Sequence, residues 1–156
     1  MQDVYKHQLM ASKEFFERST RVLEEADSGF SPKDGTMTVA QQVAHAAQTI
    51  EWFVTGAVRP EGFDLDFEKL AKETNACTSL TEARKWMDRA YAAAIQFIDA
   101  QGPEGLSKTL PPGPVMSGQP IGEIFWAMVE HTAHHRGALT VYSRMLGKVP
   151  VMPYVG

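Results

Sequence analysis

Apolar side chains recur every three or four residues along four long stretches of the chain, the spacing of helices that each bury one face. The stretches cover approximately residues 3–27, 36–57, 79–102 and 120–146. Gly29 and Gly147 follow the first and fourth stretches, and Gly102 ends the third. Ser79 opens the third stretch with the capping-box spacing to Glu82. No credible strand pattern accompanies them. The pattern therefore predicts four long amphipathic helices and no sheet.

Two connectors are longer than the few residues that usually join neighbouring bundle helices. Residues 58–78 include a short helical turn at Phe67–Lys72, and we expect them to cross one end of the bundle. Residues 106–120 are rich in proline and glycine, which fits either a lid at a functional site or a simple crossover strap. The prediction is an all-α four-helix bundle with long crossover connections, forming a single domain over residues 1–156.

Composition and charge narrow the classes of function. A hydrophobic content of 44% and a charged content of 22% are ordinary for a soluble globular protein. The net charge of −4, with no basic run among aromatics, disfavours a nucleic-acid partner. The single cysteine, Cys77, excludes an intramolecular disulfide and suits a reducing cytosol. Without a signal core or a membrane-length apolar run, we expect a cytoplasmic protein that does not enter a membrane.

The candidate chemistry lies in the histidines of the last predicted helix, within the run Glu130–Gly137. His131 and His135 are four residues apart, so their rings project from one face of a helix, as two ligands of a divalent metal must. His135 projects into the buried stripe and His131 lies at its edge, whereas His134 points toward the polar side. The pair predicts a metal site that still needs a third ligand.

His45, on the second predicted helix, is the candidate third ligand. It lies off the centre of the apolar stripe, on the side that carries Gln48 and Trp52. A histidine in this position is commonly a surface residue, but a large aromatic on the same side is expected where a helix faces a pocket or a partner. We therefore assign Trp52, Gln48 and His134 to a candidate pocket beside the metal.

Arg136 also falls on the apolar side of the last predicted helix. A buried guanidinium needs a partner, because an isolated buried charge is very costly. We expect a structural ion pair with a carboxylate, or hydrogen bonds to carbonyls, on a neighbouring helix.

Two segments carry a resemblance to a known family: Phe30–His45, and His131–Leu139 with its His-x3-His-Arg-Gly sequence. In helix order and histidine placement, essentially the whole chain resembles the DinB (YfiT-like) superfamily. The resemblance implies a four-helix bundle, often dimeric, in which three histidines bind zinc, nickel or a similar divalent ion. Here the ligands would be His45, His131 and His135. Relatives frequently carry glutamine at the position of Ala138, so the contact of that glutamine is not expected here.

Two classes of function follow from this site. Three protein ligands plus an open position are the catalytic rather than the structural pattern for zinc, and the charge of the ion would lower the pKa of a bound thiol or water. The resemblance implies a metal-dependent thiol S-transferase or hydrolase acting on a small molecule, with a low-molecular-weight thiol as cosubstrate. The alternative is a non-catalytic metal-binding, stress-response protein that acts as a dimer. A third interpretation treats the histidines as ordinary core and surface residues.

No general base is evident from the sequence. Glu51 and Glu130 neighbour the faces that carry the histidines, but both fit a solvated or ligand-supporting role better than a catalytic one. Trp52, Trp126 and Tyr154 lie off the main stripes or in the C-terminal tail, and we expect them to cover a homodimer interface.

Overall fold

The computed structural model describes residues 1–155, which form four long helices, one short helix and two single 3-10 turns. The long helices are α1 (Gln2–Thr20), α2 (Val39–Gly56), α4 (Leu80–Leu106) and α5 (Ile124–Met145), and the short one is α3 (Phe67–Asn75). The 3-10 turns are η1 (Glu25–Asp27) and η2 (Ile121–Glu123). Residues 1–155 contain no β-strand and only one isolated bridge, between Thr109 and Pro120. The predicted all-α class is confirmed.

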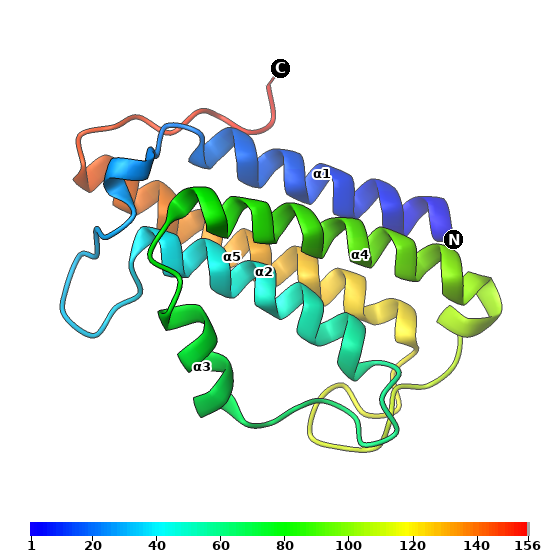
Figure 1. Cartoon of the computed structure of the whole chain (residues 1–156). Helices are drawn as coiled ribbons and strands as arrows, with labels where there is room; N and C mark the ends of the chain where they lie inside the picture. The colour runs from blue at the N-terminus through cyan, green and yellow to red at the C-terminus, as the bar shows by residue number, and fades with distance from the viewer. Residues whose placement is uncertain (156) are drawn as a thin grey trace.

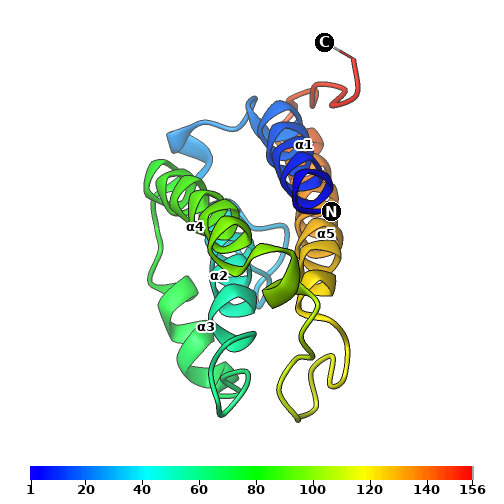
Figure 2. The ribbon, with the colours of Figure 1, turned by 90° about the vertical axis from the view of Figure 1, so that its right-hand side faces the viewer.

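The four long helices lie side by side, and α3 flanks α2 on the outside (Figure 1). α2 packs against α4, α5 and α3, whereas α1 packs against α4 and α5 (Figure 2). Fully buried alanines on α2 and α4 allow close approach of neighbouring helices; they are Ala40, Ala44, Ala47, Ala83, Ala90 and Ala94. These contacts fix α2, which carries His45, beside α5, which carries the other two histidines.

One apolar stripe from each long helix forms the core, as the sequence pattern predicts. The fully buried side chains include Leu9, Ile50, Ile98, Phe125 and Leu139. Burying a side chain of this size contributes about 1.5–3 kcal/mol. The core therefore supplies the main force that holds the two histidine-bearing helices in register.

The first helix is shorter than predicted, because α1 ends at Thr20 rather than near residue 27. The hydroxyl of Thr20 donates to the carbonyl of Phe16, and Arg84 of α4 donates to the carbonyls of Thr20 and Leu23. These bonds satisfy carbonyls that a longer helix would use, and Leu23 turns into the core. The end of α1 could not be predicted from its own periodicity, because it depends on the guanidinium of Arg84, which lies on α4.

The remaining helix boundaries lie close to the predicted ones. Thr38 and Ser79 cap the N-termini of α2 and α4 through their hydroxyl groups. The short helical turn predicted at Phe67–Lys72 extends to Asn75. The last helix begins at Ile124, since η2 occupies the residues after Pro120.

The long connector between α4 and α5 begins at a break in the chain direction. Gly102 has φ 62° and interrupts the helical dihedrals at the predicted stop, and the chain makes one further turn to Leu106. The loop that follows is closed by backbone hydrogen bonds from Leu110 to Gln119 and from Ile121 to Lys108. Figures 1 and 2 show it at one end of the bundle, beside the connector that leads from α2 to α3.

Within residues 1–155, no helix combines the length and the apolar character that crossing a membrane requires.

Candidate metal centre

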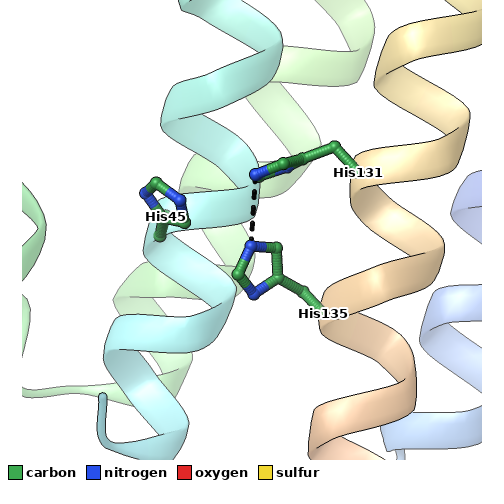
Figure 3. Close-up of side chains that lie close together, drawn as sticks. All are labelled: His45, His131 and His135. Carbon is green, nitrogen blue, oxygen red and sulfur yellow. Dashed lines mark hydrogen bonds between the residues drawn. The ribbon is translucent and has the colours of Figure 1, made fainter. Parts of the chain in front are cut away.

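Three histidine side chains from two helices converge where α2 packs against α5. His45 comes from α2, and His131 and His135 come from successive turns of α5 (Figure 3). One nitrogen of each ring lies within 4.8 Å of the other two. The ring of His45 has its centroid 5.2 Å from that of His131 and 4.9 Å from that of His135. The fold thus brings together the three residues that the sequence suggests as ligands.

The two histidines of α5 have a separation that suits a shared ion. Nε2 of His131 and Nε2 of His135 are 3.2 Å apart. Two imidazoles on one tetrahedral zinc, with bonds of about 2.0–2.1 Å, hold their nitrogens roughly 3.3 Å apart. The donor set of three imidazoles also matches the preference of zinc, nickel, copper and iron. Both the spacing and the chemistry of these residues therefore fit a divalent transition metal.

Gln42 orients His135 from one turn before His45 on α2. Nδ1–H of His135 donates to Oε1 of Gln42, so Nε2 of His135 is unprotonated and accepts a hydrogen bond from Nε2 of His131, the dashed line in Figure 3. The amide of Gln42 donates to the hydroxyl of Tyr142 over 3.2 Å, and that hydroxyl donates to the carbonyl of Met37 over 3.1 Å. The chain of hydrogen bonds runs through buried side chains, so it fixes the tautomer and direction of His135.

The position of Gln42 in the sequence already places it beside His45. Residues three apart on a helix are neighbours on its surface, so Gln42 had to lie next to His45. The amide oxygen of a buried glutamine needs a hydrogen-bond donor, and the buried ring of His135 supplies one. Which ring nitrogen it meets depends on how α2 packs against α5, and no local pattern contains that information.

The surroundings keep the three imidazoles neutral. Burial, reinforced by the charge of the neighbouring histidines, lowers the pKa of His135 to about 3 and that of His131 to about 4. Burial, and then the proximity of His134, lowers the pKa of His45 below its ordinary value. A neutral imidazole is the form that binds a metal ion. At neutral pH the three rings can therefore bind without first losing a proton.

His131 has one buried nitrogen that the protein leaves without a partner. Among residues 1–155, Nδ1 of His131 is the buried side-chain polar atom that makes no hydrogen bond. Leaving such an atom unsatisfied costs about 1–3 kcal/mol.

A cavity of about 380 Å³ adjoins the histidines, between α2, α3 and α5. His45 and His131 form part of its wall, together with Trp52 and Gln48, which the sequence assigns to a pocket. His134 does not line this cavity; it is exposed on α5, with its ring centroid 5.0 Å from that of His135. Residues 106–120, for which the sequence allows either a lid or a crossover strap, contribute nothing to the lining, and α3 forms the outer wall.

Side-chain hydrogen bonds from α2 to α3 and to the connector before it hold α3 over the cavity. The amide nitrogen of Gln48 donates to the carbonyl of Leu70 over 3.0 Å and to the carboxylate of Glu73 over 2.9 Å. Nε1–H of Trp52 donates to the carbonyl of Asp64 over 2.7 Å, just before α3 begins. Two residues that line the cavity thus also position its outer wall.

Arg136 has a different partner from the one expected. Within residues 1–155 it forms no ion pair; its guanidinium donates to the hydroxyl of Tyr154 over 3.1 Å and lies over the rings of Tyr154 and Phe15. The C-terminal tail covers this part of α5, and it brings an aromatic ring rather than a carboxylate to the guanidinium. The sequence could not show where the tail folds back.

The two glutamates near the histidine-bearing faces have separate surroundings. Glu51 accepts a hydrogen bond from Nε1–H of Trp86 over 2.8 Å and takes no part in the cavity. Glu130 is exposed but lines the cavity next to His131. A carboxylate therefore lies on the cavity wall, although it makes no hydrogen bond to the three histidines.

Comparison with known proteins gives a family match over most of the chain. The family model described as the DinB superfamily matches residues 10–139, a range that includes all three histidines and every residue that lines the cavity. No curated protein matches the chain.

Proposed function

Because the chain belongs to the DinB superfamily, we propose that His45, His131 and His135 bind one divalent transition-metal ion, zinc or nickel, and that this site serves a small molecule in the adjoining cavity. The convergence of three neutral imidazoles beside a cavity carries the proposal. Three protein ligands leave a coordination position open, which is the pattern of catalytic rather than structural zinc.

The residues of the chain would prepare the site in three ways. Burial keeps the rings neutral, and Gln42 holds His135 with its lone pair toward the other two rings. α3 and Trp52 shield one side from bulk water. When bound, the ion supplies a Lewis acid that polarises or deprotonates the group presented to it.

We propose thiol S-transfer or hydrolysis as the reaction class, with a low-molecular-weight thiol as cosubstrate in the first case. A thiol suits a site of this kind, because soft and borderline metals bind sulfur well and lower the pKa of a thiol. The cavity beside His45 and His131 would then hold the second, electrophilic reactant.

A non-catalytic metal-binding protein, acting as a homodimer in a stress response, is the second candidate. The observation that favours it is the nature of the hydrogen-bond partner of the triad: Gln42 is an amide and cannot exchange a proton during a reaction. Under this proposal the cavity would hold a fixed ligand that closes the metal position.

Cobalt replacement tests the proposal and separates the two candidates. Titrating the untagged protein with Co²⁺ should produce visible absorption bands that saturate at one equivalent, and His45→Ala should abolish them. The exposed neighbour variant His134→Ala is the matched control and should behave as wild type. Adding azide, a small anion that binds open cobalt positions, should then shift the bands. Absence of any saturable band contradicts metal binding; bands that azide cannot shift favour the non-catalytic candidate.

A further inference from the structure

Aromatic and aliphatic side chains form most of the wall of the cavity beside His45 and His131. Four aromatic residues from three helices take part: Trp52, Phe53, Phe67 and Trp126. Phe67 and Trp126 are largely exposed to solvent, at 61% and 65%, although each sits on the cavity rim. Exposed aromatic side chains that surround a hollow mark a binding site for apolar surface.

The polar groups on the same wall already have partners inside the protein. The amide nitrogen of Gln48 donates to a carbonyl of α3 and to Glu73. The hydroxyl groups of Thr49 and Thr74 each donate to a carbonyl of their own helix. These donors are therefore not available to a ligand. Away from the histidines, the wall offers a ligand mainly apolar contacts.

The charges around the cavity restrict the ligand further. Of the described residues that line it, none is lysine or arginine, and Glu130 is the one carboxylate. An anionic group placed away from the histidines would find no cation, and burying an unpaired charge is costly. A cationic group could pair only with Glu130, which lies next to His131, and there the proposed divalent ion would repel it. A ligand of the cavity can therefore carry a charge only at the end that binds the metal ion.

We infer that the cavity accepts a compact molecule with an uncharged aromatic or alicyclic body and a single polar end that faces His45 and His131. A volume of about 380 Å³ suits such a molecule, since it lies near the small end of the range of about 300–1,000 Å³ for ligand pockets. The inference rests on the proposed function, because the bound ion would receive the polar end, and it adds the class of molecule that the site selects.

Three thiols with the same metal-binding end and different bodies test this directly. The probes are 4-methylbenzyl mercaptan, which is neutral, 4-(mercaptomethyl)benzoate, which carries an anion, and 4-(aminomethyl)benzyl mercaptan, which carries a cation. Each is titrated into the zinc-loaded full chain while the indole N–H signals are followed by NMR. Trp52 and Trp126 line the cavity, whereas Trp86 donates to Glu51 elsewhere and serves as an internal reference.

The neutral probe should move the signals of Trp52 and Trp126 but not that of Trp86, and bind more tightly than either charged probe by roughly tenfold or more. Ala71→Phe, which fills the cavity from α3, should abolish the effect, while Lys72→Phe on the same helix but off the wall should not. Equal or tighter binding of a charged probe, or unaltered binding to Ala71→Phe, overturns the inference. Zinc content, measured on the same samples, reports separately on the proposed function.

Discussion

At the scale of single residues, the candidate metal centre depends on Gln42, which carries no metal-binding group itself. Its Oε1 accepts the Nδ1–H of His135, and this bond selects the tautomer that exposes Nε2. Groups that orient metal-binding histidines typically change metal affinity by about 10–100-fold when they are removed. We therefore expect the hydrogen bond that Gln42 accepts from His135 to raise metal affinity as well as to stabilise the packing.

We expect Gln42→Leu to weaken zinc binding by about 10–100-fold, because His135 can then adopt the tautomer with its proton on Nε2. Competition against a chromophoric chelator measures the affinity. Gln42→Glu keeps an acceptor of similar size at the same place and should retain binding within about tenfold. Equal affinity of Gln42→Leu and wild type would show that Gln42 plays no part in orienting His135.

The histidines also make the stability of the metal-free protein depend on pH. The pKa of His135 is lowered to about 3 and that of His131 to about 4, from the ordinary value of 6.5. At a pH between the lowered pKa and 6.5, each of these histidines binds more protons in the unfolded chain than in the folded one. The folded state is therefore most stable, as far as these two rings are concerned, above about pH 6.5. The free energy of unfolding falls as the pH drops from 6.5 toward the folded-state pKa values of about 4 and about 3.

Urea unfolding of the chelator-treated protein from about pH 7.5 to about pH 5 checks this expectation. The free energy of unfolding should fall more steeply with decreasing pH for wild type than for the double variant His131→Gln, His135→Gln. The other titrating groups are the same in both proteins, so the difference in slope reports on the two rings. Parallel pH profiles would contradict the assignment of lowered pKa values.

At the scale of elements, α3 differs from the four long helices. It has nine residues, and Thr74 is the one that is buried. Hydrogen bonds from Gln48 and from Gln41, the latter to the carbonyl of Asn75 over 3.2 Å, attach it to α2. Few buried apolar contacts and exposed backbone hydrogen bonds are the conditions for local opening. We therefore regard α3 as the wall of the cavity that opens most readily.

Hydrogen exchange should show α3 exchanging much faster than α2 and α4. Gln48→Ala should raise exchange further in α3 and leave α4 unchanged, because it removes the bonds to Leu70 and Glu73. Gln8→Ala, at an exposed position on α1, is the matched control. Protection of α3 equal to that of α2 would contradict a mobile wall.

The long helices and the candidate metal-binding histidines could be predicted from the sequence, because both depend on local periodicity. The spacing of four residues that places His131 and His135 on one face is a property of a single helix. By contrast, the end of α1 depends on Arg84 from α4, and the partner of Arg136 depends on the tail carrying Tyr154. These contacts join residues distant in sequence, so no periodic pattern along the chain could predict them.

At the scale of the whole molecule, a bound ion would tie α2 to α5. His45 lies on one helix and the other two ligands on the second, so unfolding would have to release the ion. We expect zinc at about 100 times its dissociation constant to raise the free energy of unfolding by about 2.7 kcal/mol. Urea unfolding with zinc and with chelator measures the gain, which His135→Ala should lose. A wild-type protein that zinc does not stabilise would contradict a site that spans the two helices.

The most direct measurement is the metal content of the untagged protein, determined by elemental analysis for wild type, His45→Ala, His135→Ala and His134→Ala. The three-histidine site predicts about one divalent ion per chain in wild type and in His134→Ala, and loss of the ion in the other two variants. Metal-free wild type that binds zinc no more tightly than about millimolar, or a His45→Ala variant that keeps its ion, would contradict the site.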